Sequence, residues 1–227
     1  MGRLVTGRDA VAESKNHRAA ILASIRRSLG ASEAPIAIAT EYEAIERTYT
    51  RSSESSASAI VELFEDRLRE YDAGVYHANE QLVAGVIAEI LTARGKKGLA
   101  IPAGLAPKWL PKGFVFEEAD LFDADQLDRA EGVLSACTVA IAETGSILLQ
   151  NAPGQGPRIL SLVPDYHLCV VLAEQVVATV PEAFERLRAT SALPTTFISG
   201  PSATADIEMT RIKGVHGPRF LDVLIVG

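Results

Sequence analysis

The feature that most constrains the fold of this chain is a change in the spacing of its apolar residues near Asp125. Before this point, apolar residues recur at helical spacing in long segments, and short apolar runs such as residues 74–77 stand between them. After it, short β-rich runs follow one another and only turns separate them. Helices that alternate with short strands are typical of a wound α/β core. We therefore expect an α/β fold in which helices flank a wound mixed sheet.

The individual elements follow from the same spacing and from the Gly and Pro residues that end helices and strands. Helices are expected at residues 15–29, 60–71, 79–95 and 182–188, with a short helical piece near Ala205. Strands are expected at residues 74–77, 99–101, 114–116, 133–142, 146–149, 159–163, 168–172, 195–198 and 221–226.

The N-terminal part is expected to be separate from the main domain. Ile21, Leu22, Ile25 and Leu29 lie on one face of the first helix, and the segment 51–56 is the most linker-like part of the chain. We place a boundary near Ser53, which gives an N-terminal helical arm and linker at 1–52 and the main domain at 53–227. A single helix cannot bury its apolar face alone. It must pack on the main domain or on another subunit, and both alternatives stay open.

Charge and cysteine content exclude several classes of protein. The chain has 22 Lys and Arg residues against 29 Asp and Glu residues, a formal charge of −7, which argues against nucleic-acid binding. Cys137 and Cys169 are too few and too far apart to ligate an iron–sulfur cluster or a structural zinc ion by themselves, so we expect no cofactor bound by this chain. Both lie in apolar runs typical of core residues in a reducing compartment.

The distribution of apolar residues bears on location. No apolar stretch approaches the roughly 18 residues that a membrane span needs, and the first residues lack the apolar centre of a secretory signal. We expect a cytoplasmic protein without a membrane span.

The first candidate site is Glu143-Thr144-Gly145-Ser146, which places a carboxylate and two hydroxyl groups at the end of an apolar run. Strand ends are where α/β proteins bind ligands. A partly desolvated carboxylate is suited to proton transfer, or to nucleophilic attack when ionised. The alternative is a surface hairpin with an exposed glutamate.

The second and third candidates follow along the chain. Arg158 comes directly after a loop rich in Gly and Pro, where a guanidinium can pair with a carboxylate or a phosphate, although such residues more often form surface ion pairs. The loop at 150–157 lacks the third Gly of a dinucleotide fingerprint and has no Walker lysine. In extended geometry Asp165 and His167 point to one side, so His167 could be oriented by a carboxylate; we favour a pocket position for it over a metal site.

The fourth candidate is the segment from Gly200 to Glu208 together with the Gly-rich turn around His216. Ser202 and Thr204 suit a helix N-terminus, whose free N–H groups attract anions. Asp206 competes for those donors, and His216 between glycines is accessible, or simply a turn residue.

Five motifs in a fixed order resemble the LUD-domain family, in particular its lactate-utilisation protein C subfamily. They are Glu143 to Ser146, Arg158 to Ser161, Pro164 to His167, Gly200 to Glu208 and Gly214 to Pro218. The resemblance covers the chain from about the third helix to the C-terminus and extends to the N-terminal arm. It implies a fold similar to the sugar-phosphate isomerase and CoA-transferase (NagB/RpiA/CoA transferase-like) superfamily. It also implies membership of a three-protein system that oxidises L-lactate to pyruvate, in which partner subunits carry the iron–sulfur clusters.

Two functional hypotheses follow from this resemblance. In the first, the chain binds a small anionic metabolite, with Glu143 or His167 moving a proton and Arg158 holding the anion. The other substrate-binding candidates are Thr144, Gly145, Ser146, Ser161, Ser202, Thr204, Asp206 and His216. In the second, the chain is an assembly or regulatory subunit for iron–sulfur partners. A homo-oligomer stays open in both. The first hypothesis requires that these widely separated turns converge on a single cleft.

Overall fold

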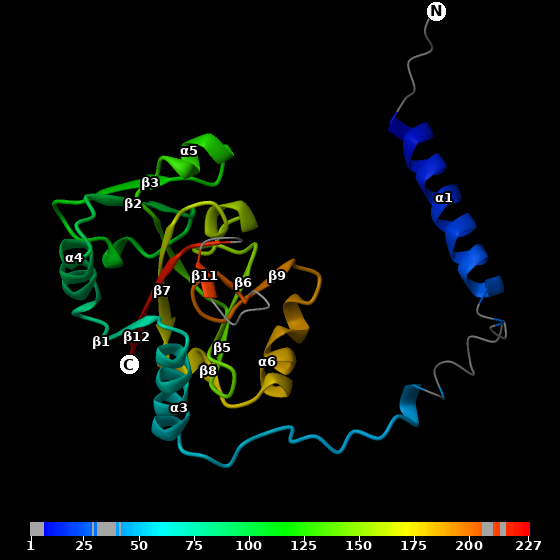
Figure 1. Ribbon diagram of the computed structural model, residues 1–227, viewed down its shortest axis with the longest axis horizontal. Helices are drawn as coiled ribbons and strands as arrows, with labels where there is room; N and C mark the ends of the chain where they lie inside the picture. The colour runs from blue at the N-terminus through cyan, green and yellow to red at the C-terminus, as the bar shows by residue number, and fades with distance from the viewer. Residues whose placement is uncertain (1–6, 29, 31–39, 41, 206–210, 214–216) are drawn as a thin grey trace, which may run out of the picture. The chain divides into compact units, whose positions relative to one another are not determined.

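The computed structural model describes residues 7–28, 30, 40, 42–205, 211–213 and 217–227 (Figure 1). The chain divides into two compact units, Met1–Tyr49 and Thr50–Gly227. The first unit contains helix α1 (Gly7–Ser28), which begins earlier than the spacing of its apolar residues predicts. Ile21 and Ile25 of α1 are exposed. None of the helices in the described part of the chain combines the length and apolar content that crossing a bilayer requires.

The centre of the second unit is a six-stranded parallel sheet in the order β1-β12-β7-β4-β2-β3. Its strands are β1 (Gly74–Ala78), β2 (Gly98–Ile101), β3 (Val115–Glu118), β4 (Val133–Ala136), β7 (Tyr166–Leu172) and β12 (Phe220–Val226). The central strands β4, β7 and β12 are almost entirely buried, as expected for a parallel sheet covered on both faces. This confirms the predicted wound α/β fold.

A second, mixed sheet has four strands in the order β8-β5-β6-β9. They are β5 (Val139–Ile141), β6 (Ser146–Gln150), β8 (Val176–Val177) and β9 (Thr195–Ile198). A short hairpin pairs β10 (Ala203–Ala205) with β11 (Arg211–Lys213). The run 133–142, expected as one strand, is two strands, because the chain leaves the large sheet at Cys137-Thr138 and enters the small one at Val139.

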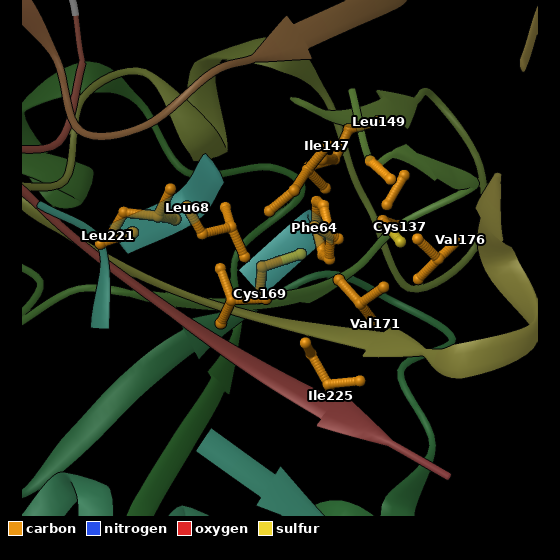
Figure 2. Close-up of a cluster of buried hydrophobic side chains, with 14 residues drawn as sticks. Phe64, Leu68, Cys137, Ile147, Leu149, Cys169, Val171, Val176, Leu221 and Ile225 are labelled. Atoms are coloured by element: carbon orange, nitrogen blue, oxygen red, sulfur yellow. The ribbon is translucent and has the colours of Figure 1, made fainter. Parts of the chain in front are cut away.

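Helices cover the large sheet on both faces. Helix α4 (Val83–Ala93) packs on the face that carries Leu168 and Leu224, and α3 (Ala57–Glu70) packs on the opposite face. Figure 2 shows Phe64 and Leu68 of α3 among side chains of both sheets. The remaining helices are α5 (Ala124–Asp128), α6 (Val180–Leu187) and the 3₁₀ turns η1 (Pro107–Trp109), η2 (Arg158–Ser161), η3 (Ala173–Gln175) and η4 (Arg188–Thr190). Both cysteines are buried in the core as free thiols, as predicted.

Two further expected elements are wrong. Residues 159–163 are not a strand, because the 3₁₀ turn η2 occupies Arg158–Ser161. Prolines on both sides of this segment remove backbone donors that a sheet would need, and the Ser161 hydroxyl donates back to the Arg158 carbonyl oxygen. The segment near Ala205, expected to be helical, is strand β10, since residues 203–205 find backbone partners in β11.

The strand order contains one switch point. From β2 the chain continues to β3 on one side, and then returns to β4 on the other side of β2. Gly154 links the carboxyl ends of β2 and β4, since its oxygen accepts a hydrogen bond from Ala136 N and its N–H donates to Ala103 O, both at 2.8 Å. In open α/β sheets ligands bind at such a point.

Candidate functional site

His167 is a buried imidazole in the middle of the fold. It is the second residue of β7 and is 0% exposed. Its Nε2 atom lies 2.7 Å from the Oγ atom of Ser135, on the neighbouring strand β4. Its Nδ1 atom is buried without a hydrogen-bond partner among the described residues. Burial and, to a smaller extent, the positive charge of Arg158 together lower the pKa of His167 to about 4. The imidazole is therefore neutral near pH 7, and its Nδ1 atom is available for a further hydrogen bond.

Arg158 supplies a cation beside this imidazole. It is the first residue of η2, and its Nη1 atom donates to the Oγ atom of Ser161 at 3.2 Å. Within the described ranges its guanidinium makes no ion pair with a carboxylate. Partial desolvation lowers the pKa of Arg158 from its ordinary value but leaves it charged at neutral pH. A charged arginine without a carboxylate partner can bind an anionic ligand.

The structure thus brings together three of the predicted residues, Arg158, Ser161 and His167, and adds Ser135. Chemically, the group combines a fixed positive charge, two hydroxyls and a neutral imidazole. Such a set can bind a carboxylate and offer one further hydrogen bond. Sequence reasoning missed Ser135, whose only signal was its position as a polar residue inside an apolar run.

Asp165 does not orient His167. Its two carboxylate oxygens accept hydrogen bonds from the Nε and Nη2 atoms of Arg219, the latter at 2.8 Å. Hydrogen bonding to Arg219 lowers the pKa of Asp165 despite partial burial. The partner of the imidazole is the hydroxyl of Ser135, from the adjacent strand, instead of the carboxylate two residues earlier.

The turn that carries Glu143 joins β5 to β6 in the small sheet. Glu143 is exposed, and its Oε1 atom accepts a hydrogen bond of 2.8 Å from the backbone N–H of Val180, at the start of α6. A carboxylate at this position stabilises the free donors and the dipole of a helix N-terminus. Its Oε2 atom has no partner in the described part of the chain. The carboxylate is therefore held at one oxygen and accessible at the other.

The small polar residues of the same turn are tied to the end of β9. Thr144 donates to the Oγ atom of Ser146 at 2.8 Å, and that atom lies 2.6 Å from the Oγ atom of Ser199. Ser146 is buried. Gly145 has a positive φ of 59° and packs against Arg67 of α3. Sequence reasoning missed Ser199, which follows an ordinary strand without any motif.

The C-terminal candidates are only partly placed. The backbone N–H of Ser202 donates to the carbonyl oxygen of Pro218 at 2.8 Å, and Thr204 lies in β10 opposite Ile212. Asp206 and His216 lie outside the described residues. That all the predicted residues line one cleft stays a prediction.

A hollow lies at the carboxyl ends of β2 and β3, and part of its lining comes from the loop at 150–157 that precedes Arg158. Its volume is about 520 Å³. Its lining includes Asp120, which follows β3, and residues on both sides of Gly154 in the loop at 151–157. The signal in the sequence was a carboxylate directly after a strand. No three His, Cys, Asp or Glu side chains gather as a metal-binding group anywhere in the residues that the structure describes.

Comparisons with known proteins agree with this architecture. Residues 43–226 match the model of the LUD domain. A protein of Deinococcus radiodurans named lactate utilization protein C is 43% identical over 175 residues, which are 76% of this chain and 82% of that protein. A protein of the same name from Shouchella clausii is 35% identical over 41% of this chain and 43% of that protein. The crystal structure of a DUF162 family protein from Deinococcus radiodurans superposes with a TM-score of 0.66 and 38% identity, covering 76% of this chain and 99% of that one. The chain therefore belongs to the LUD-domain family.

Proposed function

We propose that this chain is a component of an L-lactate utilisation system, in which it works with iron–sulfur partner proteins in the oxidation of L-lactate to pyruvate. The observation that carries this proposal is the 43% identity to a lactate utilization protein C over most of both chains. The oxidation releases two electrons and two protons, and the proposal assigns the electrons to clusters in the partner proteins.

Within this system, the chain binds a small carboxylate through Arg158. The guanidinium has no carboxylate partner within the described residues, and the nearby Ser161 hydroxyl fixes its orientation. A bidentate pair between a guanidinium and a carboxylate is strong and specific in geometry. The neutral His167 then acts as a hydrogen-bonding group behind the anion, since burial keeps it uncharged.

Glu143 is the better candidate for moving a proton. His167 is 0% exposed, so it exchanges protons with solvent only through an opening of the fold. The Glu143 carboxylate is exposed, and the Val180 N–H holds only one of its oxygens. This assignment requires Glu143 and Arg158 to serve the same bound molecule.

A second candidate function is a non-catalytic assembly or regulatory subunit. The observation that favours it is that both predicted proton carriers have structural partners, Glu143 at the start of α6 and His167 in the core. In that case Arg158→Gln and Arg158→Lys leave lactate oxidation unchanged.

The test combines binding and reconstitution with the full chain. Calorimetry with lactate and pyruvate is carried out on the wild type, Arg158→Gln and Arg158→Lys, with Arg129→Gln as a matched exposed control. We expect Arg158→Gln to weaken binding by about tenfold or more, Arg158→Lys to weaken it less, and Arg129→Gln to leave it unchanged. Lactate oxidation by a mixture with the iron–sulfur partners should fall in the same order. Equal binding by all four proteins would exclude Arg158 as the anion site, and unchanged oxidation would favour the assembly function.

A further inference from the structure

The hollow at the carboxyl ends of β2 and β3 is separate in its chemistry from the Arg158 site. It lies beside the switch point of the large sheet and has a volume of about 520 Å³. Its lining is made of small and cyclic side chains with one carboxylate and one amide, from Ala103, Gly104, Asp120, Asn151, Ala152, Pro153, Gly156 and Pro157. No Lys or Arg is among them. The hollow therefore disfavours an anion and suits a neutral ligand that donates hydrogen bonds.

The walls of the hollow are fixed before any ligand arrives. Gly154 ties the 151–157 loop to the ends of β2 and β4 through two backbone hydrogen bonds. Gly104 has a φ of +78°, and a Cβ atom on it would lie 2.8 Å from the Cβ atom of Pro153, so the two loops meet in a contact that only glycine permits. Preorganised walls reduce the entropy that binding costs.

Asp120 gives the hollow a directed acceptor. Its Oδ2 atom accepts a hydrogen bond of 2.6 Å from the backbone N–H of Ala103, which holds the carboxylate in place. Its Oδ1 atom makes no hydrogen bond within the described ranges. A half-buried, oriented carboxylate oxygen of this kind accepts from hydroxyl groups.

We propose that this hollow binds the vicinal diol of a ribose, as part of a neutral nucleoside-like ligand. In dinucleotide-binding wound α/β sheets, a Gly-containing turn follows one strand, and an acidic residue about 20 residues further on accepts a hydrogen bond from a ribose hydroxyl. Here β2, the turn at Gly104 and Asp120 after β3 occupy those places. The ring and sugar carbons pack on the proline and alanine walls.

A phosphate is not expected in this hollow. Phosphate sites on such folds use the N-terminus of a helix that follows the Gly turn. After Gly104 the chain forms only the three-residue turn η1 (Pro107–Trp109). With no cation in the lining and one carboxylate, an added phosphate should weaken binding.

Ligand-observed NMR and calorimetry on the full chain test the proposal with adenosine, 2′-deoxyadenosine, AMP and free ribose. We expect adenosine to bind about tenfold more tightly than 2′-deoxyadenosine, which lacks one hydroxyl, and more tightly than AMP. If ribose binds as tightly as adenosine, the hollow still recognises a vicinal diol, but the ligand that supplies the diol is a free sugar and not a nucleoside. The absence of binding by all four, equal binding of adenosine and its deoxy form, or tighter binding of AMP would overturn the proposal.

Two variants locate the binding. Asp120→Asn keeps an oxygen for the Ala103 N–H but places an amide donor where Oδ1 stood, so we expect at least a tenfold loss of adenosine binding. The matched control, Asp128→Asn in α5, should bind normally. Ala152→Leu fills the hollow without removing a hydrogen-bonding group, and it serves if Asp120→Asn fails to fold. Undiminished binding in a folded Asp120→Asn, or in Ala152→Leu, would overturn the assignment.

Discussion

The hydroxyl of Tyr166 donates a hydrogen bond of 2.8 Å to the Oδ2 atom of Asp222, a carboxylate that is 0% exposed. The two residues lie near the amino ends of the neighbouring strands β7 and β12. Arg94, just after α4, pairs with the same carboxylate through two nitrogen atoms. Burial and the negative charge of Asp222 raise the pKa of Tyr166, so the phenol stays protonated as a donor.

Tyr166→Phe is expected to destabilise the fold by roughly 1.5–3 kcal/mol, because it removes a hydrogen bond to a buried charged group. Urea denaturation of the full chain measures the change. Tyr42→Phe, at an exposed tyrosine, is the control and should change the free energy of unfolding by about 0.5 kcal/mol or less. Equal effects of the two substitutions would show that the buried hydrogen bond contributes nothing specific.

Stability is expected to fall between pH 6.5 and pH 4 because of His167. Burial and the nearby charge of Arg158 lower its pKa from 6.5 to about 4 in the folded chain, whereas the unfolded chain keeps the ordinary value. In this window the unfolded state binds more protons than the folded state, so the free energy of unfolding rises with pH. The contribution is fully present above about pH 6.5 and amounts to about 3 kcal/mol.

Urea midpoints measured across this pH window test the assignment to His167. His167→Gln should flatten the dependence in the window, and His17→Gln, at an exposed position of α1, should leave it as in the wild type. A dependence that survives His167→Gln would assign the titration to other groups.

Glu143 offers a way to separate a structural role from a chemical one. Glu143→Gln keeps an oxygen acceptor for the Val180 N–H, so its stability should stay within about 1 kcal/mol of the wild type. Glu143→Ala removes the acceptor and should cost about 1 kcal/mol more. Lactate oxidation with the iron–sulfur partners should fall in both variants if Glu143 moves the proton. A fully active Glu143→Gln would leave it only the role of stabilising α6.

Much of the fold could be predicted from the sequence, because the spacing of apolar residues and the Gly and Pro residues that end helices and strands act locally. Strand β9 has the limits expected from its β-branched run, and α3 and β12 differ from expectation by only a few residues. The exceptions are segments where tertiary partners decide the structure. Residues 203–205 pair with β11, which carries no strong strand signal of its own, and Cys137-Thr138 changes sheets without a Gly or Pro.

The candidate site was harder to predict for the same reason. Asp165 and His167 have the alternation of one strand face, yet the imidazole bonds to Ser135, 32 residues away in the chain. The residue that lies beside a side chain on the adjacent strand of a parallel sheet cannot be inferred from the spacing of residues within either strand. Asp120 was missed because its importance depends on the strand order, which places the ends of β2 and β3 beside the switch point.

Substitution of Gly145 can test whether packing against α3 holds the turn that carries Glu143. Its φ is +59°, and a Cβ atom at this position would lie 2.8 Å from the Cβ atom and 3.0 Å from the backbone carbon of Arg67. Gly95 has a similar φ of +65° but nothing within 4 Å, so Gly95→Ala isolates the conformational cost, which should be roughly 1–2 kcal/mol.

Gly145→Ala adds steric overlap with α3 to that cost, so we expect it to lower the free energy of unfolding by at least about 1 kcal/mol more than Gly95→Ala. Urea denaturation of both variants measures the difference. If the two substitutions cost the same, the turn can move away from α3 at no cost. The position of Glu143 would then depend on its hydrogen bond to Val180 and not on packing against Arg67.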